Sequence, residues 1–347
     1  GRSVYAPLFS GVFWDMQDVM LEDVERIEVI SGPGGTMWGV NAVNGVINII
    51  TRGAAATQGS LVALGAASDG LDAAFRQGGQ SGNASWRAYG KVLRRSHGET
   101  AAGTRVNDAW RQAQLGFRAD WERGSDTFTI NGNLYRGRPG QPEPGEISVT
   151  GTALRLGELD TEGANLTAHW ERALDGGGRL SVQAYLDHTR REVPPTFTES
   201  LWIADLQLEH TLPAWGRHSL MWGANLRHSW DSVQNSEVIA FLPANEQQTW
   251  GSLYAQDELA LHPDLSLTVG ARIERNDYTG NEFLPTARLA WRMSPRHTVW
   301  SALSRTVRAP TRLDVDAFIP GRPPYLLRGG PQVRSEVAKV FEAGYRG

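Results

Sequence analysis

Apolar and polar residues alternate with a period of two over most of the chain from about residue 59 onward. In segment 265–274 the odd positions are apolar and the even positions are polar or glycine, and the same alternation recurs at 113–122, 166–171 and 219–227. A period of two is typical of a β-strand whose two faces meet different surroundings. We count about fourteen such segments of roughly 10–14 residues. They exceed the ~5–6 residues usual in globular proteins and approach the ~9–11 that a membrane strand needs.

The alternation also predicts which side chains share a face. We expect one set to point to a lipid-facing surface: Leu265, Leu267, Val269, Ala271 and Ile273. Glu258, Arg272 and Glu274 have the opposite parity and should face the interior. Five tryptophans share the outward parity: Trp121, Trp170, Trp202, Trp222 and Trp291. Those near strand ends are predicted to serve as interfacial anchors.

The connections between these segments alternate between tight turns and long loops. The long ones are 97–109, 138–161, 232–246 and 308–335, and one hairpin, at 68–70, is short where a long loop is expected. A transmembrane barrel sorts its connections in this way, whereas a soluble β-sandwich or propeller has no reason to do so. The pattern therefore predicts an all-β fold, an antiparallel up-and-down transmembrane β-barrel, with residues 1–52 packed on its concave polar face.

Composition narrows the function classes. The 13 tryptophans outnumber 10 phenylalanines and 8 tyrosines, which suits an aromatic belt at a membrane interface. Mean hydropathy is −0.37, and no apolar run is long enough for a transmembrane helix. The net charge of −4 gives no basic footprint for nucleic acid, and the absence of cysteine excludes a disulfide framework. We find neither a nucleophile-elbow motif nor closely spaced histidines, so no enzyme, metal site or cofactor is predicted.

The most specific motif is the segment 24–52, which reads VERIEVISGPGGTMWGVNAVNGVINIITR. It predicts a strand at 27–30, a Gly/Pro turn, and a second strand at 45–51. A phosphate-binding loop is the alternative, but the Gly-Lys-Ser/Thr ending is missing and no helical pattern follows the glycines.

This segment resembles the end of the plug domain of TonB-dependent outer-membrane receptors. Segments 252–258, 269–272, 304–311 and 341–346 resemble barrel strands of the same family. The resemblance implies that residues 1–52 are the C-terminal part of a plug and that 53–347 are part of a 22-stranded barrel. About half the plug and the TonB box are then expected before Gly1, and about eight strands after Gly347, so this chain alone is not expected to transport. The motif residues with an implied structural role are Glu25, Arg26, Glu28, Gly32, Pro33, Gly39, Gly45 and Asn48.

The family resemblance implies active uptake of a scarce solute across the bacterial outer membrane. The solute is expected to be a ferric siderophore, with cobalamin, haem or another metal chelate as alternatives, and a passive outer-membrane channel as a further one. Its expected partners are the TonB complex, reached through an N-terminal segment absent here, a small-molecule metal chelate, and outer-membrane lipid. One departure is Ser31, because the family usually has a basic residue there that pairs with glutamates of the barrel wall.

Two groups of residues are candidates for ligand binding. Alignment of the plug motif puts Phe13 and Trp14 on an apical plug loop, where an aromatic ring can stack on a chelate; packing under the loops is an equal alternative. The second group lies in the connection 308–335 and could bind an anionic chelate: Arg308, Arg312, Arg322, Tyr325 and Arg328. For any one of these arginines, a solvated loop position is the favoured alternative. His188 and His228 lie near predicted outer strand ends, where an ordinary polar rim is favoured over a metal or haem site.

Overall fold

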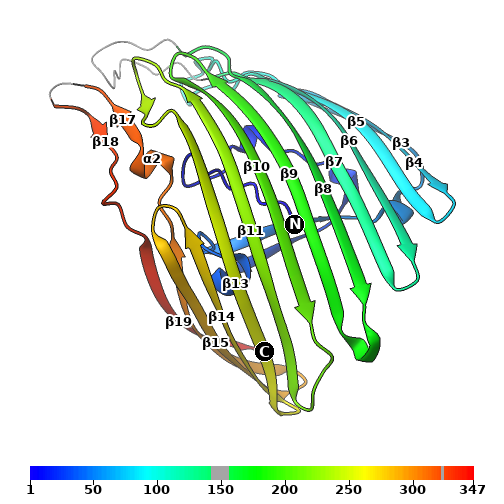
Figure 1. Ribbon diagram of the computed structural model, residues 1–347. Helices are drawn as coiled ribbons and strands as arrows, with labels where there is room; N and C mark the ends of the chain where they lie inside the picture. Colours follow the sequence, from blue (N-terminus) through cyan, green and yellow to red (C-terminus); the bar gives the residue numbers. More distant parts are fainter. Residues whose placement is uncertain (142–155, 322–323) are drawn as a thin grey trace.

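The computed structural model describes residues 1–141, 156–321 and 324–347. Fourteen long strands form one antiparallel sheet in meander order, and Figure 1 shows this sheet curving around the N-terminal segment. The fourteen strands are β3 Gly59–Ala67, β4 Gly70–Ser81, β5 Ala84–Arg95, β6 Trp110–Arg123, β7 Asp126–Pro139, β8 Asp160–Ala173, β9 Arg179–Val193, β10 Phe197–Thr211, β11 His218–Gln234, β13 Asn245–His262, β14 Leu265–Asn276, β15 Gly280–Ser294, β16 His297–Arg308 and β19 Glu336–Arg346. The predicted fold class and strand number are confirmed. In the described residues β3 and β19 are not paired with each other, so the barrel wall stays open.

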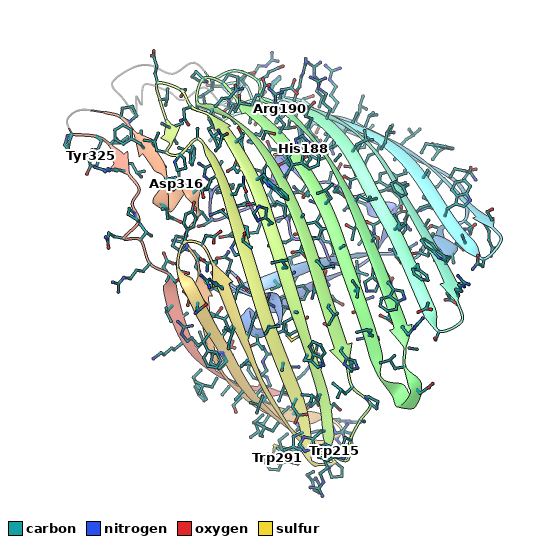
Figure 2. The ribbon with its side chains drawn as sticks, in the orientation of Figure 1. His188, Arg190, Trp215, Trp291, Asp316 and Tyr325 are labelled. Atoms are coloured by element: carbon teal, nitrogen blue, oxygen red, sulfur yellow. The ribbon has the colours of Figure 1, made fainter. Side chains whose placement is uncertain are left out.

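The strands place their side chains as the period of two predicts. In β14, Val269 is 50% exposed on one face, whereas Arg272 and Glu274 are each 5% exposed on the other face. Arg272 Nη1 donates to the carbonyl of Met37, 3.3 Å away, which identifies the polar face as the one that meets the plug. The five tryptophans predicted to face outward lie on the opposite face; Figure 2 places Trp291 at the end with the short turns, near Trp215. Parity is therefore fixed by the two environments of the sheet.

The prediction about connection lengths is correct for four loops but too simple overall. Besides the hairpin at 68–69, the connections 194–196 and 277–279 are also short at the end of the sheet that carries the long loops. The sequence predicts only the first of these three exceptions, since the other two connections are just three residues long. Several strands are also longer than predicted, up to the 18 residues of β13.

Two of the long connections contain secondary structure. The connection after β11 contains β12 Ala240–Phe241, and the one after β16 contains α2 Arg312–Val315, β17 Ala317–Ile319 and β18 Leu327–Arg328. These three short strands pair in the order β12-β17-β18, so that main-chain hydrogen bonds join the two loops. Figure 1 shows α2, β17 and β18 together beyond one end of the large sheet. The long loop 138–161 falls mostly outside the described residues, since 142–155 are not described.

The plug segment lies against the polar face of the sheet, as predicted. Its elements are η1 Trp14–Met16, η2 Leu21–Asp23, β1 Val24–Ser31, α1 Gly35–Trp38, β2 Gly45–Thr51 and η3 Ala54–Thr57, the last of which leads into β3. β1 and β2 pair as an antiparallel hairpin, with Ile30 opposite Val46. The two predicted strands are confirmed, but the one-turn helix α1 in the glycine-rich connection was not predicted. No helix in the described residues is long and apolar enough to cross a membrane.

Candidate functional site

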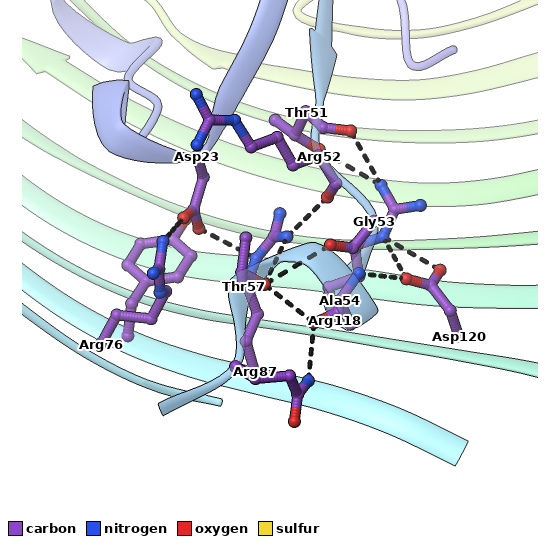
Figure 3. Close-up of polar contacts among 12 residues, drawn as sticks. Asp23, Thr51, Arg52, Gly53, Ala54, Thr57, Arg76, Arg87, Arg118 and Asp120 are labelled. Carbon is purple, nitrogen blue, oxygen red and sulfur yellow. Dashed lines mark hydrogen bonds and ion pairs between the residues drawn. The ribbon is translucent and has the colours of Figure 1, made fainter. Parts of the chain in front are cut away.

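The start of the wall anchors the plug through a buried ionic cluster (Figure 3). Asp23 ends η2 and is 1% exposed; it pairs with Arg76 of β4 and, at 2.9 Å from its Oδ2, with Nε of Arg87 on β5. Arg87 also donates to the carbonyl of Arg52, 2.6 Å away. Two arginines from the wall thus share one carboxylate from the plug. Buried charges are tolerated only when they are paired in this way.

A second anchor lies one strand further along the wall. Asp120 of β6 accepts a hydrogen bond from the backbone N–H of Ala54 at 2.6 Å, and it pairs with Arg118 at 2.9 Å. Arg118 in turn donates to the carbonyl of Thr51, 3.4 Å away. These contacts fix the junction between plug and wall. The sequence motifs did not point to these residues as anchors, although Arg118 and Asp120 both have inward parity on β6.

The motif residues of the plug divide into two groups. Arg26 pairs with Glu25 and Glu28 on the exposed side of β1, and Asn48 donates to Glu28 at 3.1 Å, so these four charged and polar residues stabilise the hairpin itself. The hydrogen bond from Arg26, followed by that from Asn48, lowers the pKa of Glu28 below its usual value.

Gly32, Pro33 and Gly39 lie against the wall instead, whereas Gly45 lies against β1. Gly32 has a φ of +86° and Gly39 a φ of +83°, conformations that favour glycine. A Cβ on Gly39 would come within 2.6 Å of Glu274 Oε2, and the carbonyl of Pro33 accepts a hydrogen bond from Arg288. Gly45 lies so close to the backbone of β1 that a Cβ would come within 2.4 Å of the Ile30 carbonyl oxygen. Gly32, Pro33 and Gly39 therefore shape the surface of the plug that fits the wall.

At the end of the sheet that carries the long loops, the connection between β16 and β19 binds the plug apex through backbone hydrogen bonds. The backbone N–H groups of Arg312 and Leu313, at the start of α2, donate to the carbonyls of Pro7 and Leu8, at 3.1 and 2.8 Å. A buried apolar cluster covers these bonds: Leu8, Val233, Phe241 and Ala317, with Phe13, Phe197 and Ile239 packed around it. Plug apex and two outer loops thus form one packed unit.

Arg312 is the centre of this unit and is fully buried. Its guanidinium pairs with Asp231 at 2.8 Å and with Asp316 at 3.1 Å, and it also donates to the carbonyl of Pro243. Asp316 further accepts a hydrogen bond from Tyr278 at 2.7 Å, and burial followed by this bond raises the tyrosine pKa. With 0% of its surface exposed, Arg312 has nothing to present to a solute, so we remove it from the candidate ligand contacts.

Arg308 has a mixed environment. It donates to Ser10 of the plug and pairs with Asp314 at 3.1 Å and Glu336 at 2.8 Å, while part of its side chain stays exposed. Burial alone would raise the pKa of Asp314, but the hydrogen bonds from Thr311 and the charge of Arg308 outweigh burial and lower it. Arg308 therefore ties plug to loop, and only its exposed part remains available for a ligand.

The two apical aromatics have different surroundings. The ring of Phe13 packs against Phe9 at 4.6 Å, and the guanidinium of Arg191 lies 4.4 Å from its centre. Arg191 also pairs with Asp15 at 2.6 Å. Trp14, by contrast, is 63% exposed. Of the two, Trp14 alone has a free ring face for stacking. Sequence reasoning missed Arg191, although its parity on β9 is inward.

The remaining candidates are less involved in this unit. Tyr325 and Arg328 are exposed, and Tyr325 lies 6.0 Å from Phe318 at the far side of the loop in Figure 2. Arg322 lies outside the described residues. His188 stacks on Trp202 at 4.3 Å and His228 contacts Trp230 at 4.4 Å, both on the outward face, which favours the polar rim. No cluster of three metal-ligating side chains occurs among the residues that the structure describes.

A cavity of about 30 Å³ lies between the plug apex and the wall, lined in part by Tyr5, Phe13 and Leu201. Its volume fits about one water molecule. This cavity is too small for a metal chelate.

A family model described as "TonB dependent receptor-like, beta-barrel" matches residues 53–347. The chain belongs to this family. The family's members are outer-membrane transporters, not enzymes, so the predicted localisation and the absence of a catalytic function agree with the match. The boundary that we draw at residues 52 and 53 stays a prediction.

Curated relatives support the assignment. The iron-regulated outer membrane virulence protein of Vibrio cholerae serotype O1 is 25% identical over 311 residues, covering 85% of this chain and 46% of that protein. The ferric enterobactin receptor of Pseudomonas aeruginosa is 24% identical and covers 90% of this chain and 49% of that protein. The vitamin B12 transporter BtuB of Vibrio vulnificus is 54% identical over 46 residues, 13% of this chain and 8% of that protein. The chain spans about half the length of the first two relatives.

Solved structures show the same fold. A mutant of the ferric enterobactin receptor PfeA from Pseudomonas aeruginosa superimposes with a TM-score of 0.79 at 18% identity, covering 99% of this chain and 59% of that one. The copper transporter OprC superimposes with a TM-score of 0.73 at 14% identity, covering 93% and 56%. The lipid-facing assignment of the apolar surface follows from this fold.

Proposed function

We propose that the full-length protein containing this chain is a TonB-dependent receptor that takes up a ferric siderophore. The observations that carry the proposal are the 63% exposed Trp14 and, in the connection 308–335, the exposed Arg328 and the partly exposed Arg308. A flat-faced, oxygen-rich anion can stack on an indole and accept hydrogen bonds from guanidinium forks. Relatives named for iron regulation and for ferric enterobactin support this substrate class.

The proposed binding site lies between Trp14 and the outer loops, with Arg308, Tyr325 and Arg328 as candidate wall contacts. Arg191 and Phe13 would support the floor from below, because they already pack against each other. No covalent chemistry is needed. Binding at the apex would change which plug conformation is favoured, and energy would enter through the TonB complex.

Cobalamin is the second candidate, because a vitamin B12 transporter is 54% identical to this chain over 46 residues. Growth tests distinguish the candidates. A deletion strain and the same strain carrying the full-length gene are compared on ferric siderophores, haem or cobalamin when iron or cobalamin is limiting. Growth on a ferric siderophore that requires an intact TonB complex is the expected result. Growth on cobalamin or haem alone would replace the substrate class, and growth independent of TonB would indicate a passive channel.

A further inference from the structure

The plug turn 31–35 contacts Arg288 and Glu342, which belong to one row of five wall residues, three of them charged. The strand register joins Glu258 to Thr268, Thr268 to Arg288, Arg288 to Ala302, and Ala302 to Glu342. All five positions have the parity that faces the plug. One arginine therefore stands midway between two glutamates, with only a short side chain between it and each of them.

The position of Arg288 gives its side chain a choice of partners. Neighbouring strands lie ~4.8 Å apart, so each glutamate backbone is about 10 Å from that of Arg288. Extended arginine and glutamate side chains can meet across that distance. In the described part of the chain, however, Arg288 forms no ion pair with either glutamate, and its Nη2 donates to the carbonyl of Pro33 at 3.2 Å.

The plug contributes no charge to this contact. Residues 31–35 are Ser, Gly, Pro, Gly and Gly, so the turn offers the wall its main chain and one hydroxyl group. Gly32 lies directly against Glu342, since a Cβ there would come within 2.9 Å of its Oε1. The charges that hold the turn thus all belong to the wall.

We propose that Arg288 is a latch with two resting positions. With the plug in place it binds the Pro33 carbonyl; when the turn moves away, it pairs with Glu258 or Glu342. The flanking carboxylates replace the acceptor that the arginine loses, so opening leaves no unpaired guanidinium in the wall. Two discrete arrangements of one side chain are what a bistable gate requires. Arg288 is accordingly a positioning residue, and the gating role rests on the proposed receptor function.

Amide hydrogen exchange of the turn tests the latch on the purified full-length receptor. The N–H groups of Gly32 and Gly34 donate to the carbonyls of Asn44 and Ala42, each at 3.0 Å, so their exchange reports opening. We expect Arg288→Ala to speed this exchange about tenfold, because the closed state loses a hydrogen bond from a charged donor, whereas the ion pair lost from the open state is exposed to water and contributes less.

The opposite effect is expected when the acceptors of the open state are removed. The double variant Glu258→Gln with Glu342→Gln should slow exchange of the turn relative to the parent receptor. Adding Ser31→Arg to Arg288→Ala should restore protection, because a plug arginine next to Gly32 can reach the same carboxylates. A merely structural Arg288 would not give the slowing, because the double glutamine variant leaves its hydrogen bond to Pro33 intact.

Arg292→Ala is the matched control. Arg292 lies on the same strand and donates to the carbonyl of Pro263 at 3.2 Å, but Pro263 belongs to a turn of the wall. Exchange of the turn that is equally fast in Arg288→Ala and Arg292→Ala, or faster in the double glutamine variant, would overturn the latch. These exchange measurements need no substrate. If only the siderophore proposal is wrong, the exchange rates of the turn will change as expected while the receptor supports growth on no chelate.

Discussion

Asp23 is the plug residue whose replacement should weaken the contact between plug and wall most. Asp23→Asn removes the one carboxylate that pairs with both Arg76 and Arg87 and keeps the side-chain volume. At the 2.9 Å separation from Arg87 Nε, the attraction is about 6 kcal/mol at an effective dielectric constant of 20. Desolvation offsets part of this attraction, and removal of one partner from a buried pair typically costs ~3–5 kcal/mol. We expect a loss within that range.

The loss should appear as destabilisation of the plug, because the wall strands keep their own ladders. Scanning calorimetry of the full-length receptor in detergent measures the plug transition, and hydrogen exchange of β1 and β2 locates the change. Asp126→Asn is the control: Asp126, at the start of β7, also pairs with an arginine, Arg172 at 2.7 Å, but both residues belong to the wall and the arginine side chain is 47% exposed, so that screening leaves the pair little energy. That variant should leave the plug transition unchanged.

A plug transition that is the same in Asp23→Asn, Asp126→Asn and the parent receptor would refute the reasoning. A partial test of the mechanism is the pair Asp23→Asn with Arg87→Gln. Since the second change removes a charge that the first leaves unpaired, the double variant should be less destabilised than the sum of the single variants.

Three further outcomes are expected. Val269→Arg should destabilise the barrel by ~2–4 kcal/mol if Val269 lies near the bilayer midplane, measured by reversible unfolding in lipid vesicles; an unchanged stability would contradict its lipid-facing position. Trp14→Ala in the full-length receptor should weaken equilibrium binding of the identified chelate by about 1 kcal/mol or more at unchanged expression, and equal affinity would assign Trp14 to packing. Arg312→Ala should leave the carboxylate of Asp231 buried without its partner and make the connection 308–335 sensitive to limited proteolysis; continued protease resistance would show that the apolar cluster alone holds the loop.

The strands and their faces could be predicted from sequence because a period of two is a local property. Each residue of 265–274 reports its own face, and a sheet between lipid and plug allows no mixture. The same argument placed Arg272 and Glu274 in the interior, where the structure finds them in contact with the plug. Connection lengths were less predictable, because a turn such as Asp277–Thr279 interrupts the alternation over too few residues to be visible.

The environment of the candidate ligand residues could not be predicted in the same way. Arg308 and Arg312 look alike in the sequence, and both lie at the start of one long connection. Arg312 becomes buried because Asp231 and Pro243, about 70–80 residues earlier in the chain, close around it. Trp14 and Phe13 are neighbours, yet only one of them lies under Arg191. Such differences depend on contacts between distant segments, for which a single sequence holds no periodic signal.

The small sheet formed by β12, β17 and β18 has a consequence for how the outer surface can vary. It is made of main-chain pairs such as Ala240 with Phe318 and Phe318 with Arg328, so its hydrogen bonds do not depend on which side chains point outward. Exposed residues of both loops can therefore be substituted while the main-chain pairing still joins the two loops. A receptor built in this way can be retuned for another solute by surface substitutions alone, and the mechanical connection from that surface to the plug apex stays intact.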